Sequence, residues 1–224
     1  MEHKFMKFHP ELEPYKSVFQ QRAAELLKRI LLFTRVLWPF KSHSKVNSPL
    51  DKPIALIIPP INAYSFFCKG LKRHLEQTGH DALVCKPVGL FSSHTKAATQ
   101  LEDYILSNNL RNCKVIGLGS GAFLPLLMSY KGRDRVSSLI TVEAPFGGRG
   151  HFLVPFFPSL FELRSKTSLL SAVREQARTF ANIHCIFFDE KDRLGRHDDI
   201  QFSESGVYQL PNSKALCECL DHLL

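Results

Sequence analysis

The sequence predicts an α/β fold, in which a mostly parallel sheet of about six strands carries helices on both faces. Two observations support this prediction. From Pro53 onward, short apolar runs alternate with longer segments of helical periodicity. The runs are nearly continuous, as in residues 54–58 (Ile-Ala-Leu-Ile-Ile), which is typical of strands buried on both faces. Strands and helices that alternate in this way form right-handed parallel units.

The first fifty residues have a different character. Residues 15–38 have a broad apolar face and a basic face, which predicts an amphipathic helix that ends before Pro39. Residues 41–53 have the composition of a linker. We therefore expect an N-terminal helix and linker at 1–50 and a main domain at 51–224.

Within the main domain each element follows from its local pattern. We expect strands at 54–58, 82–85, 113–117, 136–142 and 183–188, with a short sixth strand at 206–209. We expect helices at 65–78, 95–108, 120–130, 168–180 and 212–223. The segment 144–166 is rich in Phe, Pro and Gly and is expected to be irregular. Because ligands bind at the carboxyl ends of parallel strands, we expect the site in the loops that follow them.

The charge is uneven along the chain. The formal net charge is +8, and residues 1–50 hold nine Lys and Arg against four Glu. Two interpretations of the basic helix at 15–38 stay open: peripheral contact with an anionic membrane, or a solvated face on a helix that packs on the main domain. We expect no nucleic-acid partner, because the basic residues are not interleaved with aromatic ones.

The six cysteines contain no Cys-x-x-Cys pair, and three of them fall in or beside expected strands. This predicts free thiols in a reducing compartment, with no disulfide framework and no zinc site. We also expect no cofactor. The start of the chain is polar and lacks a signal-like apolar region, and residues 30–40 are too short to span a bilayer. We expect a cytoplasmic protein, peripheral at a membrane if the first interpretation of the basic helix holds.

The most informative motif is residues 114–122, Lys-Val-Ile-Gly-Leu-Gly-Ser-Gly-Ala. A buried strand runs into a glycine-rich turn and then into an apolar helix, which is the sequence form of a strand–turn–helix elbow. In a hydrolase elbow, Gly-x-Ser-x-Gly, the central residue is the nucleophile. Here the frame of Gly117 and Gly121 is present, but its centre is Gly119 and the serine, Ser120, comes one place later.

Four stretches together resemble the α/β-hydrolase superfamily, in particular bacterial triacylglycerol lipases and esterases. They are Pro53–Ile58 with Gly79–Val84, the elbow at 114–122, the run 135–148 ending in Glu-Ala-Pro-Phe-Gly-Gly, and 186–194. The loop 59–64 (Pro-Pro-Ile-Asn-Ala-Tyr) has a weaker similarity to polyhydroxyalkanoate synthases. The resemblance covers about residues 53–224 and implies a three-layer sandwich with a serine-type catalytic triad.

Mapped onto this chain, the resemblance implies a degenerate triad. The nucleophile position falls on Gly119, the base position on Val207, and the oxyanion-hole loop on Pro59 and Pro60. Proline has no N–H to donate, and valine cannot carry a proton. The acid position falls on Asp192, and a carboxylate without its partners performs no triad chemistry.

Alternatives for each role stay open. Ser120 is either the true nucleophile, shifted by one place, or a residue that helps to cap the following helix. Asp189 is the second candidate for the acid. The candidates for the base are His197, His94, His151 and His80, of which His197 follows the acid in the chain. Cys68 falls on an expected helix and is interpreted as a packing residue.

Two further segments have a functional and a structural interpretation. The stretch 152–161 includes Phe152, Phe156 and Phe157, which either line an apolar pocket for an acyl chain or pack as a loop on the sheet. The acidic loop around 197–199 is either a metal site or a solvated loop, and we expect no metal there. The sequence thus predicts a lipase/esterase-like protein with impaired or absent activity that binds an apolar or acyl ligand or a protein partner. The alternative is an active serine ester hydrolase that uses Ser120, Asp192 and one of the histidines.

Overall fold

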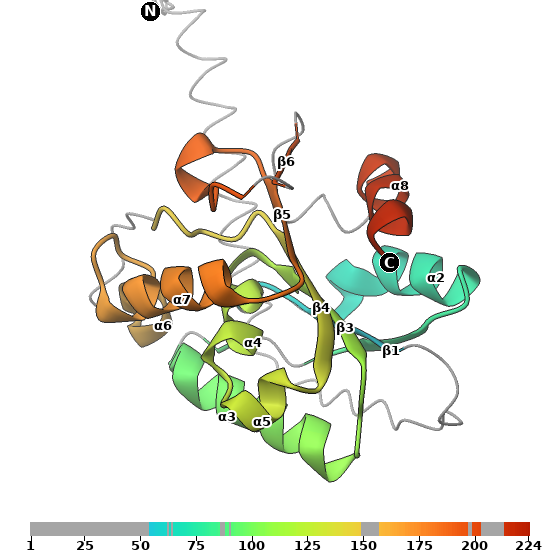
Figure 1. The fold of residues 1–224 in the computed structure, drawn as a ribbon, viewed down its shortest axis with the longest axis horizontal. Helices are drawn as coiled ribbons and strands as arrows, with labels where there is room; N and C mark the ends of the chain where they lie inside the picture. Colours follow the sequence, from blue (N-terminus) through green and yellow to red (C-terminus); the bar gives the residue numbers. More distant parts are fainter. Residues whose placement is uncertain are drawn as a thin grey trace, which may run out of the picture. The chain divides into compact units, whose positions relative to one another are not determined.

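The structure is a computed structural model that describes residues 54–61, 63, 65–85, 88–89, 91–148, 157–196, 199–202 and 213–224. Figure 1 shows these residues as a ribbon coloured along the chain. The expected helix at 15–38 and the boundary between the expected parts 1–50 and 51–224 lie outside the described residues.

The sheet has six parallel strands in the order β2-β1-β3-β4-β5-β6, which confirms the predicted α/β class. The strands are β1 (Ile54–Ile58), β2 (Asp81–Val84), β3 (Cys113–Leu118), β4 (Val136–Val142), β5 (Ile183–Phe187) and β6 (Ile200–Gln201). The sixth strand thus lies in a segment expected to be a loop, and the predicted strand at 206–209 lies outside the described residues. β6 could not be predicted, because a strand of two residues is too short to give a recognisable apolar run in the sequence.

Four of the predicted helices are present: α2 (Lys69–Gln77), α3 (His94–Ser107), α7 (Ser168–Thr179) and α8 (Lys214–Leu223). A 3₁₀ turn, η2 (Ser65–Cys68), leads into α2. The segment 144–166, expected to be irregular, contains the short helix α6 (Pro158–Glu162). Its proline stands in the first turn, where the missing N–H has no helical partner to lose.

The single helix predicted at 120–130 is wrong. The chain forms a 3₁₀ turn, η3 (Gly119–Ala122), and two short helices, α4 (Phe123–Leu127) and α5 (Tyr130–Arg133). The break falls at Ser129, whose backbone N–H donates to the Glu102 carboxylate at 2.9 Å and whose hydroxyl bonds the same carboxylate. A tertiary contact from α3 therefore ends one helix and begins the next.

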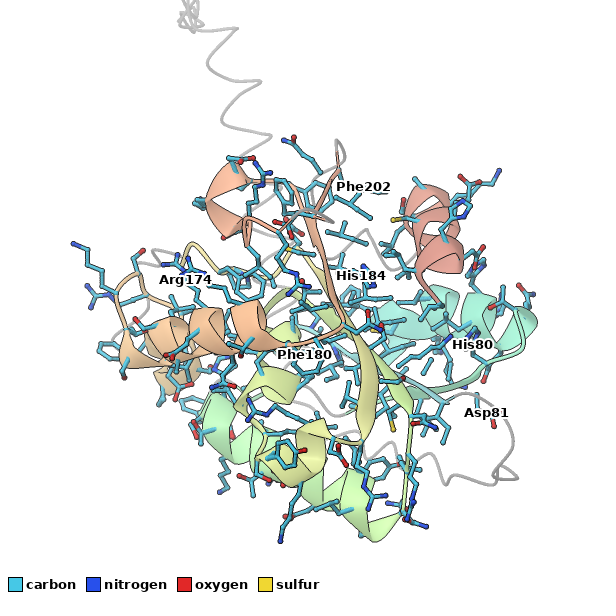
Figure 2. All side chains as sticks on the ribbon, viewed as in Figure 1. His80, Asp81, Arg174, Phe180, His184 and Phe202 are labelled. Atoms are coloured by element: carbon cyan, nitrogen blue, oxygen red, sulfur yellow. The ribbon has the colours of Figure 1, made fainter. Side chains whose placement is uncertain are left out.

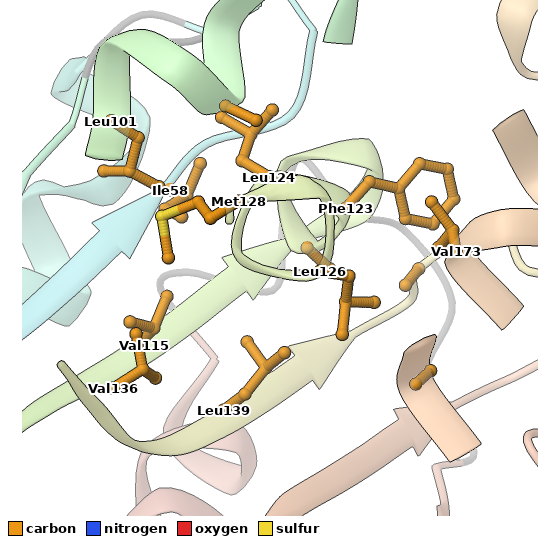
Figure 3. Packing of buried hydrophobic residues seen from close by; sticks show 14 of the residues in the cluster. Ile58, Leu101, Val115, Phe123, Leu124, Leu126, Met128, Val136, Leu139 and Val173 are labelled. Carbon is orange, nitrogen blue, oxygen red and sulfur yellow. The ribbon is translucent and has the colours of Figure 1, made fainter. Parts of the chain in front are cut away.

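The two faces of the sheet bury alternate residues of each strand. On one face Leu56, Val115 and Leu139 pack with α3, α4 and α7, whereas on the other Ile57, Ile116 and Ile140 pack with α2 and α8. Figure 3 shows the first face, where side chains of α4 fill the space between the sheet and its neighbouring helices. Two helical layers around one sheet match the three-layer sandwich that the resemblance implied.

All six cysteines are free thiols. Burial raises the pKa of Cys68, Cys85 and Cys185 to about 12, so these thiols stay protonated and act as small apolar residues. Cys68 is fully buried next to α2, as a packing residue should be. Among the helices of the described chain, none combines the length and the apolar character that a membrane span requires.

Candidate functional site

The elbow lies at the carboxyl end of β3, near the middle of the sheet. β3 ends at Leu118, and the chain turns through η3 before α4 begins. Gly119, the first residue of the turn, has a φ of +54°, which is the left-handed region that favours glycine. Ser120 does not have a positive φ. The left-handed backbone conformation at the tip of the elbow therefore falls on the centre of the glycine frame.

The two outer glycines are fixed by close backbone approach. A Cβ on Gly117 would lie 2.3 Å from the Ala122 Cα, because the turn folds back over the strand. A Cβ on Gly121 would lie 2.5 Å from the Pro59 carbonyl oxygen and 2.6 Å from that of Ile58. The frame is thus needed for the turn to pack on its own strand and on the neighbouring end of β1.

Ser120 lies inside the turn and is only 4% exposed. In the part of the chain that the structure describes, no histidine is within hydrogen-bond reach of its hydroxyl. Neither η3 nor α4 has a side-chain cap, so the capping role considered for Ser120 is not found. The serine is therefore a buried member of the turn.

The loop that maps to the oxyanion hole lies against the elbow, as the resemblance implied. Pro59 and Pro60 follow β1 directly and are both buried. The carbonyl oxygen of Pro60 accepts a hydrogen bond from the backbone N–H of Ala63 at 3.0 Å, which closes a tight turn. Neither proline has an N–H, so these two positions contribute acceptors and no donors toward the site.

Burial distinguishes the two candidate acids after β5. Asp192, at the end of the 3₁₀ turn η5 (Glu190–Asp192), is 1% exposed, and its Oδ1 accepts a hydrogen bond from the Gly147 N–H at 2.8 Å. Asp189 accepts a hydrogen bond from the Lys191 N–H and pairs with the Lys191 ammonium group at 2.6 Å on the surface. Asp192 is thus held between the loops that follow β4 and β5.

The histidines are separated by the fold. His197 and His151 lie outside the described residues. His80 lies at the amino end of β2, at the edge opposite the elbow, and burial and the nearby Lys114 lower its pKa (Figure 2). His94 begins α3 and is fully buried on the same side of the sheet as the elbow helix.

His94 forms a carboxylate–imidazole pair with Glu162 of α6. The His94 Nδ1 lies 2.6 Å from the Glu162 Oε2, and the His94 backbone N–H donates to the same oxygen at 2.9 Å. The Nε2 is buried and has no hydrogen-bond partner among the described residues. The sequence analysis named His94 but missed Glu162, because the two residues are 68 positions apart and no local pattern connects them.

Three rings pack in a row at the carboxyl edge of the sheet. The His94 ring lies 5.9 Å from that of Phe123, which lies 5.6 Å from that of Phe146. The carbonyl oxygen of Phe146 accepts a hydrogen bond from the Arg174 side chain of α7 at 2.6 Å (Figure 2). The loops after β2, β3 and β4 therefore share one aromatic core.

Of the three phenylalanines predicted to line a pocket, only Phe157 lies among the described residues. It is half-buried, precedes α6, and stacks at a tilt on Phe91 with 5.5 Å between ring centroids. Phe152 and Phe156 lie outside the described residues, and so does Val207 at the position of the base.

Glu143 is a residue at this edge that the sequence analysis did not single out. It follows β4 with a φ of +51°, an unusual conformation for a residue with a side chain. The pairing of Leu118 with Val142 places Glu143 beside Gly119 on the neighbouring strand end. Two adjacent strands thus leave the sheet in the left-handed conformation, as often occurs at functional sites.

The acidic loop after β5 is organised by its own backbone. The Asp199 Oδ2 accepts hydrogen bonds from the N–H groups of Gly195 at 2.7 Å and Arg196 at 2.9 Å. Within the described ranges, no three His, Cys, Asp or Glu side chains are grouped so that they could hold a metal ion. The neighbouring positions 197 and 198 lie outside those ranges.

Comparison with solved structures identifies the architecture. Mature lipase BlEst2 of Bacillus licheniformis matches with a TM-score of 0.57 and 11% identity, over 81% of this chain and 96% of its own. A lipase-esterase related protein from Clostridium acetobutylicum matches with a TM-score of 0.56 and 11% identity, over 79% of this chain and 96% of its own. No family model and no curated protein sequence matches the chain. The order of strands, the elbow and these two likenesses together show that the chain has the α/β-hydrolase fold of bacterial lipases and esterases.

Proposed function

We propose that this protein is a lipase/esterase-like α/β-hydrolase that has lost serine catalysis and binds an apolar or acyl ligand. The observation that carries the proposal is the elbow itself. The residue in the left-handed conformation at its tip, with a φ of +54°, is Gly119, which has no side chain that could attack an ester.

The surroundings of the elbow support the same proposal. Stabilisation of a tetrahedral intermediate requires hydrogen-bond donors, and the loop beside the elbow supplies Pro59 and Pro60. The position of the base is Val207 in the sequence. Asp192 keeps a buried place, in which it accepts a hydrogen bond from the Gly147 N–H, so the carboxylate has a structural reason to persist without the triad.

The ligand class follows from the residues around the site. The segments that follow the strands at the carboxyl edge contribute the buried rings of Phe123 and Phe146 and the more exposed rings of Phe91 and Phe157. The sequence adds Phe152 and Phe156. Aromatic and aliphatic surroundings with few polar groups suit an acyl chain. The two structural neighbours are named as a lipase and a lipase-esterase related protein, which agrees with an ester or fatty-acid shape for the ligand.

Ester hydrolysis is the direct test. Wild type and Ser120→Ala are assayed with p-nitrophenyl acetate, butyrate and octanoate, with heat-treated protein as the blank. We expect both proteins to match the blank for all three esters. Turnover by wild type that Ser120→Ala lacks would refute the loss of catalysis. Saturable binding of a dansylated C11 fatty acid by both proteins is the expected positive result, and its absence would refute an acyl ligand.

One observation favours the second candidate, an active ester hydrolase that uses Ser120 and Asp192. The His94 Nδ1 is paired with Glu162, and its Nε2 is buried without a partner among the described residues. No hydrogen bond joins it to the Ser120 hydroxyl, so this candidate requires the two side chains to come together when substrate binds. This candidate predicts that His94→Asn, which can still donate to Glu162 but lacks Nε2, reduces activity as much as Ser120→Ala does. His80→Asn, at the opposite edge of the sheet, is the matched control and should leave activity unchanged.

A further inference from the structure

Two exposed large apolar side chains of the described chain belong to segments that meet, the turn before α3 and the helix α6. Phe91 is 77% exposed and Phe161 is 50% exposed. Phe157 connects them, because its ring contacts Phe91 at 5.5 Å and its carbonyl oxygen accepts a hydrogen bond from the Phe161 N–H at 3.0 Å. We call Phe91, Phe157 and Phe161 the aromatic corner.

A buried contact joins the two elements that carry the aromatic corner. Phe91 precedes α3, and Phe157 and Phe161 belong to the start and body of α6. The pair between His94 of α3 and Glu162 of α6 joins these two elements, with the imidazole fully buried. Because both the ring and the backbone N–H of His94 bond the same Glu162 oxygen, the segments that carry the exposed rings are joined at a fixed point.

The charge around the corner is basic. The Arg164 guanidinium lies 5.6 Å from the centre of the Phe161 ring, and Lys166 is exposed two residues later. Lys96, in the first turn of α3, is also exposed. The carboxylate of this segment, Glu162, is turned inward to His94. The segments that carry the exposed rings thus present Arg164, Lys166 and Lys96 to solvent, whereas the Glu162 carboxylate bonds the buried His94 ring.

We propose that the aromatic corner docks on the surface of an anionic lipid bilayer. Exposed rings insert at the level of the lipid headgroups, while the flanking cations bind the negative surface. Both carriers of the corner, the segment before α3 and α6, follow carboxyl ends of strands, so docking brings the elbow edge of the sheet toward the membrane. This surface lies within the main domain and is separate from the helix expected at 15–38, and it does not depend on whether the elbow is catalytic.

The test is a depth measurement with a single tryptophan. The chain has one tryptophan, Trp38, so the full-length variants Trp38→Phe/Phe161→Trp and Trp38→Phe/Tyr130→Trp each carry one reporter. Tyr130 is the matched control, because it is 75% exposed but lies on α5, which leads into the amino end of β4. Both variants are mixed with phosphatidylcholine/phosphatidylserine vesicles whose acyl chains are brominated.

We expect the bromines to quench the tryptophan at 161 and to leave the tryptophan at 130 unquenched. Equal quenching at both positions, or none at 161, would overturn the proposal. Absence of quenching at 161 is also the result expected if the aromatic corner binds a protein partner and not a membrane. Charge gives an independent measurement by co-sedimentation. Arg164→Gln/Lys166→Gln should weaken partitioning by roughly fivefold per cation removed, about 25-fold in all. Lys69→Gln/Arg73→Gln on α2 is the control with the same net charge, and an equal loss there would also overturn the proposal.

Discussion

The elbow can be tested as architecture, apart from any chemistry, by adding one methyl group at a time. Gly117→Ala would place a Cβ 2.3 Å from the Ala122 Cα, and Gly121→Ala would place one 2.5 Å from the Pro59 carbonyl oxygen. Ordinary contacts lie at 3.4–4 Å, so in both variants backbone must move by about 1 Å against backbone. We expect each substitution to lower the free energy of unfolding by about 3 kcal/mol or more, which is the upper range for overpacking.

Two glycines elsewhere in the chain separate steric overlap from the other effects of alanine. Gly79 has a φ of +92°, and a methyl group added there would have nothing within 4 Å, so Gly79→Ala measures the left-handed backbone alone, at about 1 kcal/mol. At Gly89 the nearest atom is 3.8 Å away and φ is not positive, so Gly89→Ala should change stability by less than about 1 kcal/mol.

The assay is equilibrium unfolding in urea, followed by far-ultraviolet circular dichroism for the wild type and the four variants. The midpoint and the slope are fitted together, because only a shift of the midpoint at constant slope reports on the stability of the folded state. If Gly117→Ala and Gly121→Ala lay within about 1 kcal/mol of Gly79→Ala, the close packing of the elbow on β1 and β3 would be wrong.

Three further predictions follow from contacts outside the elbow. The hydroxyl and N–H of Ser129 lower the pKa of Glu102 below its ordinary 4.5, so this stabilisation is complete above pH 4.5 and is lost as the pH falls through the lower, folded-state value. Stability curves of wild type and Glu102→Gln should therefore converge in acid, and a gap independent of pH would contradict this. Because burial raises the pKa of Cys68 to about 12, a thiol reagent at pH 8 should count equal numbers of fast-reacting thiols in native wild type and Cys68→Ala, and a difference would show an accessible thiol. Asp192→Ala should cost about 1–3 kcal/mol in urea unfolding, because the Gly147 N–H loses its acceptor, and Asp192→Asn should recover part of this; equal losses would mean that the charge matters and not the acceptor.

The sheet could be predicted because burial on both faces leaves a local signature. Residues 54–58 and 136–142 are continuous apolar or small-residue runs, and both are strands with the predicted bounds. The elbow could be predicted for a similar reason. Gly117 packs on Ala122, which is close in the chain, and Gly121 packs on the adjacent end of β1.

What the sequence did not predict depends on contacts between distant residues. The break at Ser129 is caused by Glu102, 27 positions earlier, and the partner of His94 lies 68 positions later. The positive φ of Glu143 could not be predicted, because this position holds neither a glycine nor a residue of a typical turn dipeptide. The periodicity of a sequence predicts which face of a helix or strand is buried. It does not predict which side chains of other elements pack against that face.

The central claim is that the elbow keeps its shape without a nucleophile, and covalent labelling tests it most directly. Full-length protein is incubated with a long-chain fluorophosphonate, which forms a stable adduct with activated serines, and its intact mass is then measured. We predict no added mass in wild type or in Ser120→Ala, because Gly119 stands at the tip and Ser120 lies buried in the turn. An adduct in wild type that is absent from Ser120→Ala would contradict the claim.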